Sequence, residues 1–511
     1  MTQTRTQPSG LEAACRAWGA LLGAAAVRRA PEVLARYGRT TLADVPAPIA
    51  VVRPQVADQV PAVVRVAAAH RVPLYPISRG RNWGFGDACP VTDGQAVLDL
   101  SALDRIVAVD EELGYAVVEP GVTQGQLAAH LRATGSAWWL DATAAGPDTS
   151  ILGNILERGG TRAERAERVC GLAVVLADGT ALRTGFGHYP GSRAAHAARQ
   201  GVGPSLDGLF SQSNLGIVTE LGFWLQPKPA HAEIGFYALA DAALGAAIDA
   251  LRPFRIRRVI PGQPLQLTPA GERPVWLGTT TLQGHPQAVA AHRAELTAAL
   301  APVARVAFPG PEGAADPTAR AATLAALGLP ANPFFDGMLR RADPLGAPQW
   351  APAGVLSWLG GEATQRPVAP PASSDPLDEG YGFYFVWLAC PALGREARAL
   401  LDLVRPILAA HSCPPLLGLR LVTGRALTLV MRIAFDRKRG ERREAARACH
   451  RAVIAAALAA GYPPARVGIE GMALLDPAGD TFWRTVRRLK RCLDPDGILA
   501  PGRYLPPAPD A

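Results

Sequence analysis

Residues 72–86 read VPLYPISRGRNWGFG, and this stretch decides the fold that we expect. The apolar run over 72–77 predicts a buried strand that leads directly into a turn rich in glycine. Glycines in such a turn let the backbone approach a ligand closely, and successive backbone N–H groups form a nest for anionic oxygens. Arg79 and Arg81 add charged donors. The turn therefore predicts a phosphate or pyrophosphate site, and a plain glycine-rich turn between two strands is the alternative.

The rest of the N-terminal half continues with short strands and tight turns. Residues 97–100 and 115–122 are typical of buried strands, and 150–154 of a second turn of small residues. The run 172–185 (LAVVLADGTALRTG) places an Asp-Gly pair between two apolar runs, which is a strong hairpin signal. The run 207–227 passes from a polar turn into a strand of β-branched and aromatic residues. Together these runs predict an α+β nucleotide-binding domain.

In this order and spacing, the segments resemble the vanillyl-alcohol oxidase and p-cresol methylhydroxylase (PCMH) family of FAD enzymes. The run 493–503 (LDPDGILAPGR) is similar to the closing signature of that family, and the resemblance covers residues from about 11 to 505. It implies an α+β fold, in which a PCMH-type FAD-binding domain of two α+β subdomains lies under an α+β cap with an antiparallel sheet. The residues expected to hold FAD lie in the matching motifs: Ser78, Arg79, Gly80, Arg81, Asn82, Trp83, Gly84, Phe85, Pro120, Gly121, Ser150, Ile151, Gly153, Asn154, Gly216, Ile217, Val218 and Arg503.

The chain divides into segments of different character. We expect N-terminal packing helices over 1–40, the FAD-binding domain over 41–226, a substrate or cap domain over 227–478, and a C-terminal segment over 479–511 that returns to the first domain. In the second domain, helices are predicted over 241–252, 286–300, 395–411 and 441–460, and strands over 381–390, 417–422 and 426–435. A Rossmann domain is not expected, because Cys89 stands where the third glycine of its fingerprint would fall.

Flavin enzymes need little acid–base machinery, because the isoalloxazine ring itself accepts the hydride and the protein positions the substrate. By resemblance, Arg466 aligns with an arginine beside the ring, where a cation stabilises the negative charge of reduced flavin. A surface arginine at the start of a strand is the alternative. Glu470 follows four residues later and is a candidate base or a partner that neutralises Arg466.

The resemblance fails at the positions that bind substrate. Relatives that oxidise phenols hold the phenolate with an arginine and three tyrosines, whose positions align here with Phe85, Arg162 and Ala465. An acidic residue that assists oxidation in those relatives aligns with Ala145. Without the hydroxyls a phenolate would be left unpaired, which costs several kcal/mol and argues against a para-alkylphenol substrate. Arg162 adds positive charge near the pocket and suggests a substrate that carries a carboxylate.

The attachment of the flavin is the second point of difference. Many relatives tether the flavin through a His or Tyr on a strand that aligns here with 379–387, and this segment contains no His. Phe383 takes the tether position, with Tyr381 and Tyr384 within two residues. We expect tightly held, non-covalent FAD, and a tyrosyl link through one of the two tyrosines is the alternative.

Composition narrows the remaining classes. With 511 residues, 49% hydrophobic and 19% charged, the chain is long and apolar enough for two substantial cores. The net charge of +8 is small for a chain of this length, and no zinc-finger or helix-turn-helix motif accompanies the basic stretches. No nucleic-acid partner is therefore expected. Seven cysteines without a CxxC favour a reducing cytoplasm. No metal site and no membrane span are predicted.

These observations predict an FAD-dependent oxidase or dehydrogenase that moves a hydride from a small organic substrate to flavin N5. Electrons would then pass to O2 or to an electron-carrier protein, and a role in specialised-metabolite biosynthesis is expected. The alternatives are a flavin-dependent oxidative cyclase or redox-neutral rearrangement enzyme, and a non-catalytic FAD-binding protein. By analogy with relatives, we expect a homodimer or a higher homo-oligomer.

Overall fold

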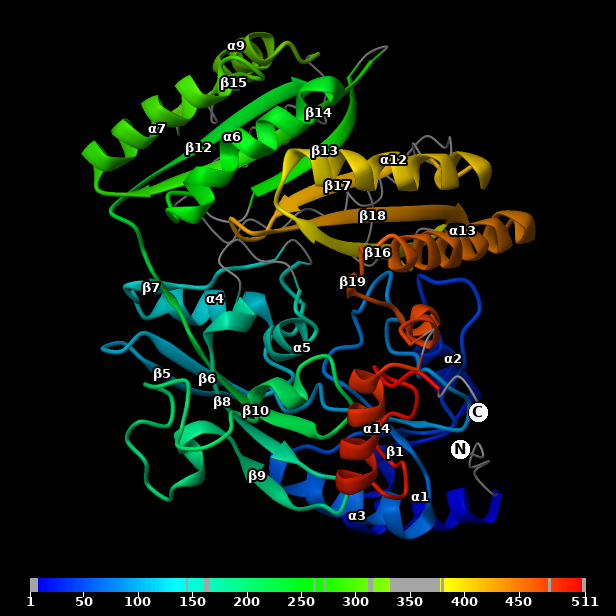
Figure 1. Ribbon diagram of the computed structural model, residues 1–511. Coiled ribbons are helices and arrows are strands. Elements are labelled where there is room, and N and C mark those ends of the chain that lie inside the picture. The colour runs from blue at the N-terminus through cyan, green and yellow to red at the C-terminus, as the bar shows by residue number, and fades with distance from the viewer. Residues whose placement is uncertain are drawn as a thin grey trace.

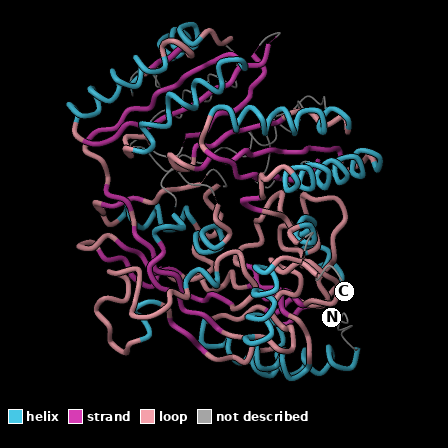
Figure 2. The backbone as a smooth tube through the Cα atoms, in the orientation of Figure 1, coloured by secondary structure: helices cyan, strands magenta, loops and turns pink. Residues whose placement is uncertain are grey.

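The fold is taken from a computed structural model of the chain. It describes residues 8–143, 146–159, 165–260, 263–270, 273–310, 316–330, 377, 381–476 and 479–507. Figure 1 shows small sheets in the lower half of the molecule and a large sheet with covering helices in the upper half. The backbone tube in Figure 2 shows that long loops surround the lower sheets.

The first sheet is built from the early strands in the order β1-β2-β4-β3, and both β2 and β3 run parallel to β4. Its strands are β1 (Val27–Arg28), β2 (Val51–Val52), β3 (Leu74–Ile77) and β4 (Ala96–Asp99). Three helices accompany it: α1 (Pro8–Leu22), α2 (Pro31–Tyr37) and α3 (Val60–His70). Trp18 of α1 is fully buried, and its indole donates to the Val63 carbonyl of α3 at 3.0 Å. Helix α1 therefore packs on α3, the helix that precedes β3 and the glycine turn.

The second sheet is antiparallel, with the order β5-β6-β10-β8-β9. Its strands are β5 (Ile106–Asp110), β6 (Tyr115–Val118), β8 (Val169–Val175), β9 (Ala181–Arg183) and β10 (Ile217–Trp224). Helices α4 (Gln124–Ala133) and α5 (Ile151–Leu156) pack on it, and β7 (Trp138–Trp139) pairs with β11 (Gln226–Pro227). The predicted hairpin is confirmed as β8 and β9, joined through Gly179 at φ +81°.

The upper half holds an eight-stranded sheet in the order β15-β12-β14-β13-β17-β18-β16-β19, with every neighbouring pair antiparallel. Its strands are β12 (His231–Ala240), β13 (Gln263–Ala270), β14 (Arg273–Gly284), β15 (Arg305–Ala307), β16 (Tyr381–Pro391), β17 (Leu416–Leu421), β18 (Ala426–Asp436) and β19 (Pro464–Arg466). The strands predicted over 381–390, 417–422 and 426–435 are confirmed. The sequence analysis did not predict β12, β13 and β14.

Helices cover one face of this sheet (Figure 1). They are α6 (Leu244–Ile256), α7 (Pro286–Leu300), α12 (Gly394–Ala410) and α13 (Gly440–Ala459), with α9 (Pro317–Leu327) at the far edge. Alternate residues of β16 and β18, such as Tyr384, Val386 and Met431, are buried under these helices. Because side chains alternate along a strand, the intervening residues face the lower half.

The end of the described chain packs against the first half. Helix α14 (Thr481–Leu493) lies beside the lower sheets in Figure 1. The buried Lys490 ammonium donates to the carbonyls of Asn214 at 2.6 Å and Leu499 at 2.7 Å. Asp494 accepts from the backbone N–H groups of residues 498 and 499 and pairs with Lys490. The closing signature of the sequence lies beside strand β3, through a parallel bridge between Leu74 and Leu499.

The two halves meet tightly at the glycine turn. Gly84 donates its N–H to the Thr41 hydroxyl at 2.7 Å and accepts from the Phe385 N–H of β16 at 3.0 Å. Its φ is +75°, and a Cβ there would lie 2.5 Å from the Phe385 ring and 2.9 Å from the Phe383 ring. Only glycine fits both the backbone angle and the space. The residue therefore fixes how closely the cap sheet approaches the first half.

Candidate functional site

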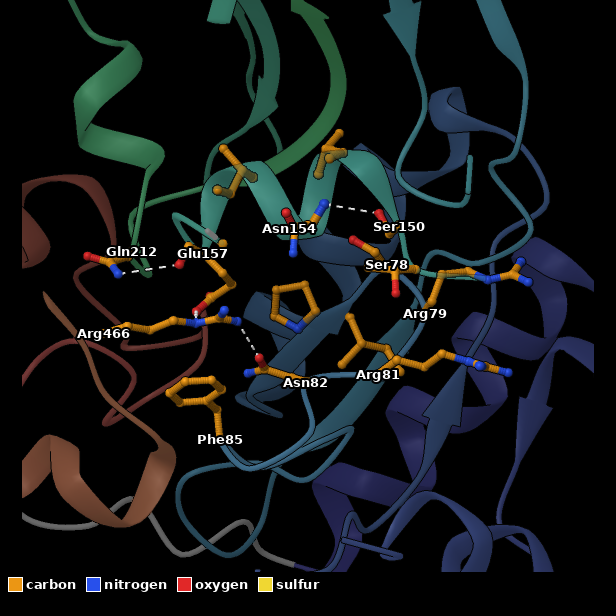
Figure 3. Close-up of a pocket in the computed structure, with 18 of the residues that line it drawn as sticks. Ser78, Arg79, Arg81, Asn82, Phe85, Ser150, Asn154, Glu157, Gln212 and Arg466 are labelled. Atoms are coloured by element: carbon orange, nitrogen blue, oxygen red, sulfur yellow. Dashed lines mark hydrogen bonds and ion pairs between the residues drawn. The ribbon is translucent and has the colours of Figure 1, made fainter. Parts of the chain in front are cut away.

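A cavity of about 570 Å³ lies between the loops of the first half and the cap sheet. This volume is within the usual range for a small-molecule or cofactor pocket. Most of the residues expected to hold FAD line it, as does the expected catalytic residue Arg466 (Figure 3). They are Ser78, Arg79, Gly80, Arg81, Asn82, Trp83, Phe85, Ser150, Gly153, Asn154, Gly216, Ile217, Val218, Arg466 and Arg503.

Four of the expected FAD residues do not line the cavity and instead support the segments that surround it. Gly84 packs against the cap, as described above. The Pro120 carbonyl accepts from the Ser150 hydroxyl at 2.6 Å. A Cβ on Gly121 would lie 2.4 Å from the Ser101 carbonyl oxygen, so this glycine allows two backbone segments to meet. Ile151 is fully buried in the core of the second sheet.

Residues 150–154 form the start of a helix rather than the predicted turn. Ser150 is the N-cap of α5, and its hydroxyl accepts from the Gly153 N–H at 3.0 Å. Ser150 caps the helix, and Gly153 allows the helix to lie close to Ser78. The sequence analysis interpreted both as turn residues. A Cβ on Gly153 would lie 2.9 Å from the Ser78 hydroxyl, so α5 begins directly against the loop after β3. The two motifs thus form one continuous wall.

Asn154 presents a defined group to this cavity. The buried Arg165 guanidinium donates to the Asn154 amide oxygen at 2.7 Å and to the Gln124 amide oxygen at 3.2 Å. A guanidinium can only donate, so the Asn154 oxygen is committed to it and the amide nitrogen remains for the cavity (Figure 3). Asn82 is oriented in the same way, because its amide oxygen accepts from Arg466 at 2.6 Å. Both side chains therefore offer N–H donors.

Arg466 belongs to a buried charge cluster at one end of the cavity. Its Nε lies 3.9 Å from a carboxylate oxygen of Glu157. Glu157 also accepts from the Tyr504 hydroxyl at 2.6 Å and from Arg503, which donates to the Tyr75 hydroxyl as well. One carboxylate thus serves two guanidinium groups, and the cluster carries a net positive charge.

The pKa shifts in this cluster follow from burial and neighbouring charge. Burial lowers the pKa of Arg466 below its ordinary value, and the Glu157 carboxylate offsets only part of this effect. For Glu157, burial acts to raise the pKa, but Arg503, Arg466 and the Tyr504 hydroxyl outweigh it and the pKa falls. Glu157 is therefore ionised at neutral pH and holds both cations beside the cavity.

The cap contributes an aromatic wall with a cation in it. Phe385 and Trp387 of β16 and Val430 and Arg432 of β18 line the cavity. Phe85 stacks on Phe385 with ring centroids 5.5 Å apart and meets the Trp387 ring edge-on at 5.9 Å. Aromatic rings thus form the side of the cavity next to the cap, which suits a planar organic molecule.

Two expected catalytic residues lie away from this cavity. Tyr384 is on the opposite face of β16, buried under α13, where its ring stacks on His450 at 4.7 Å. The expectation that Tyr384 acts at the flavin was wrong, because strand alternation turns it toward the helices. Glu470 pairs with Arg447 at 3.0 Å and does not reach the cavity wall, so its expected roles as a base or as the partner of Arg466 do not fit this placement.

The remaining expectations fall on positions that cannot be placed in the same way. Arg162 and Ala145 lie outside the described residues, and of Tyr381 only the backbone, at the start of β16, is described. Phe383, at the tether position, is fully buried between Trp83 and Ala434. Among the described cavity-lining residues there is no histidine, and the single tyrosine, Tyr75, accepts a hydrogen bond from Arg503.

The sequence analysis missed Glu157, Trp387 and Arg432. A signal existed for Glu157, which follows Ser150 by seven residues and Asn154 by three. These positions share one face of a helix, but the segment was interpreted as a turn. Arg432 lies in the middle of a strand that is mostly apolar, and a charge in the interior of such a strand is a signal for a lined pocket.

Comparison with known proteins agrees with this geometry. The model of a family described as an FAD binding domain matches residues 48–185. The 1'-carboxy-chondrochloren decarboxylase of Chondromyces crocatus is 35% identical, with 98% of each chain covered. The flavoprotein subunit of the hydroxylating 4-cresol dehydrogenase of Pseudomonas putida is 41% identical over 42% of each chain.

Solved structures agree as well. A p-cresol methylhydroxylase structure with substrate bound superposes with a TM-score of 0.82 and 26% identity, and 98% of each chain is covered. The chain belongs to the vanillyl-alcohol oxidase and p-cresol methylhydroxylase family. The 4-ethylphenol oxidase of Gulosibacter chungangensis shares the fold, with a TM-score of 0.84 at 23% identity and 99% of each chain covered. As a member of this family the protein is an FAD-dependent oxidoreductase with a PCMH-type FAD-binding fold.

The cavity residues fit FAD. The loop from Ser78 to Asn82 and the start of α5 line one wall of the cavity, and Arg79 and Arg81 on this loop would supply cations for a pyrophosphate. Within the described part of the chain, no cluster of His, Cys, Asp and Glu is suited to a metal ion. No helix among the described residues has the length and apolar character that a membrane crossing requires.

Proposed function

We propose that the protein oxidises a small organic substrate by hydride transfer to flavin N5, in a pocket built for a substrate other than a phenol. The observation that carries the proposal is the cap wall. It presents Phe385, Trp387 and Arg432 opposite the FAD-binding loops. On the facing FAD-binding loop, Phe85 stands at the position that the family resemblance aligns with a phenol-binding tyrosine, and its ring lies under the Arg466 guanidinium at 4.1 Å.

The chain's own residues have separate tasks in this proposal. FAD supplies the two-electron acceptor, while the aromatic wall excludes water and orients the substrate. Arg466, held by Asn82 and Glu157, places a fixed positive charge where negative charge develops on reduction. The substrate loses a hydride from a carbon next to O or N, or from a benzylic carbon, and then a proton. No described side chain on the cap wall is a general base, and the proton leaves to solvent with the oxidised product.

Anaerobic titration tests the proposal. Purified holoprotein is mixed with acids, alcohols, amines and phenols under argon, and loss of the oxidised flavin spectrum is recorded. We expect bleaching by at least one non-phenolic class and weak or no bleaching by para-alkylphenols. Bleaching by alkylphenols alone would refute the assignment of the pocket. A redox-neutral rearrangement would convert substrate with the flavin still oxidised, and a non-catalytic protein would show neither change.

A second candidate, oxidative decarboxylation, is favoured by one comparison. The relative that matches over 98% of both chains is named a decarboxylase of a carboxylated compound. In such a step, the carbon β to a carboxylate loses a hydride to the flavin and the carboxylate leaves as CO2. The electron pair of the broken C–C bond becomes the new double bond, so charge and electrons balance. Release of one CO2 per flavin reduced would distinguish this reaction from simple oxidation.

The electron acceptor and the assembly complete the proposal. We propose O2 or a separate electron carrier as oxidant, non-covalent FAD, a homodimer or a higher homo-oligomer, and a place in specialised-metabolite biosynthesis. The decarboxylase relative supports the last point. Mixing the reduced protein with O2 and with an artificial acceptor in stopped flow separates an oxidase from a dehydrogenase.

A further inference from the structure

Arg432 is placed unusually for a cap residue, because it stands on the cavity face of the central sheet. It pairs across the strands with Phe385, and residues directly opposite in an antiparallel pair share a face. Its guanidinium carbon lies 5.3 Å from the Phe383 ring centroid and 5.2 Å from that of Phe385. The residue is 8% exposed. The two rings therefore hold a buried cation in one orientation on the wall that faces the FAD-binding loops.

A second donor accompanies it on the same wall. Trp387 is two residues from Phe385 on β16 and thus diagonal to Arg432, a spacing that long side chains can bridge. Its indole Nε1 is buried and has no hydrogen-bond partner among the described residues. Buried N–H groups are rarely left without an acceptor. A ligand atom that accepts hydrogen bonds would satisfy it.

The charge of the cavity points to an anion as that ligand. Among the described residues that line the cavity, the cations are Arg79, Arg81, Arg432, Arg466 and Arg503, and the acids are Asp87 and Glu157. Arg81 is also paired with Asp148 at 3.3 Å, and the pyrophosphate of FAD brings two negative charges to the loop that carries Arg79 and Arg81. Arg79 and Arg81 lie on the FAD loop, and Glu157 serves Arg466 and Arg503. Arg432 is the described cation on the substrate side.

We propose that Arg432 and the Trp387 indole form an anion subsite that binds the carboxylate of an arylalkyl carboxylic acid. The inference rests on the proposed function and names the substrate class of that site. Arg432 offers five N–H donors in a planar fork, so a carboxylate can bind it in addition to any protein neighbour. The rings of Phe85 and Phe385 take the aryl part of the same ligand. The subsite thus selects acids over neutral analogues of the same shape.

The test uses equilibrium binding, which does not depend on turnover. 3-Phenylpropanoate and its neutral analogue 3-phenylpropanamide are titrated into anaerobic holoprotein by calorimetry. We expect the wild-type protein to bind the acid at least about tenfold more tightly than the amide. R432M should weaken acid binding by about 10- to 100-fold and change amide binding by less than about threefold, as expected for charged hydrogen bonds.

Three further variants keep the test decisive. W387F removes only the indole N–H and should weaken acid binding by about tenfold. R432K keeps the charge without the fork and should bind the acid with intermediate affinity, which gives a reading even if R432M fails to fold. R442M removes an exposed arginine of α13 and should leave both ligands unaffected.

Equal affinity of the wild-type protein for acid and amide would overturn the subsite, as would equal loss of both ligands in R432M. If an alcohol or amine bleaches the flavin but the acid does not bind, the subsite fails and the oxidoreductase proposal stands. If the acid binds in an Arg432-dependent manner and no compound bleaches the flavin, the subsite stands and the proposed reaction fails.

Discussion

Glu157→Gln is the substitution that tests the charge cluster most directly. The glutamine has nearly the same shape, and its amide oxygen still accepts a hydrogen bond. It removes, however, the negative charge shared by Arg466 at 3.9 Å and by Arg503. The Glu157 side chain is 14% exposed, so water replaces little of what is lost.

The expected cost follows from the burial of all three groups. Removing one partner of a buried ion pair leaves an uncompensated charge and costs about 3–5 kcal/mol. Glu295→Gln is the matched control, because Glu295 pairs with Arg257 on the surface, where both side chains are about half exposed. An exposed pair of this kind contributes about 0–1 kcal/mol. Both variants replace Glu by Gln, so the difference between their losses of stability measures the effect of burial.

Urea denaturation of the two variants and the wild-type protein at equal FAD concentration measures this difference. The pH dependence gives a second reading. The pKa of Glu157 is lowered in the folded state, so its contribution to stability is complete above the ordinary value of 4.5 and is lost as the pH falls through the folded pKa. The gap between wild type and Glu157→Gln should therefore narrow below pH 4.5. A loss at neutral pH no larger than that of Glu295→Gln would refute the reasoning.

Three other predictions follow from the fold. Gly84→Ala should destabilise the protein by about 2–4 kcal/mol and weaken FAD retention, since strain at positive φ adds to a clash with the cap. Gly135→Ala, at φ +65° with open space around it, should cost only the strain, and equal melting temperatures of the two variants would contradict the packing argument. Burial, with a smaller effect of Arg451, lowers the pKa of His450 to about 4. The contribution of neutral His450 to stability should thus be complete above pH 6.5 and decline as the pH falls toward 4. His450→Phe should flatten this decline in melting temperature, and an unchanged slope would disprove the argument. Acid precipitation should leave the flavin in the supernatant, and a flavin-sized mass increase on the denatured chain would show a covalent link instead.

Much of the FAD site could be predicted from local sequence. The loop over 78–83 and the positions 150, 153 and 154 line the cavity because glycine, serine and asparagine have local effects on the backbone that do not depend on the rest of the fold. Gly84 shows the limit of this reasoning. Its positive φ is a local property, but its role is to admit Phe383 and Phe385 from a strand about 300 residues later.

The substrate side was less predictable, since strand alternation tells which residues share a face but not which face meets the cavity. Tyr384 and Phe385 are neighbours in sequence, yet the first is buried under α13 and the second lines the pocket. Helices α12 and α13 decide which residues of β16 face the cavity, because they cover one side of the sheet. No pattern within β16 itself contains that information.

The sequence by itself determined the β8–β9 hairpin, several strands and helices of the cap, and the glycine-rich character of the early loop, because backbone freedom, capping and apolar periodicity act over a few residues. Only the tertiary structure decided that Glu157 would meet Arg466 and Arg503, and that Arg432 would face the same cavity. These groups come from distant segments, and their burial, charge balance and orientation exist only after the cap sheet has packed against the first half.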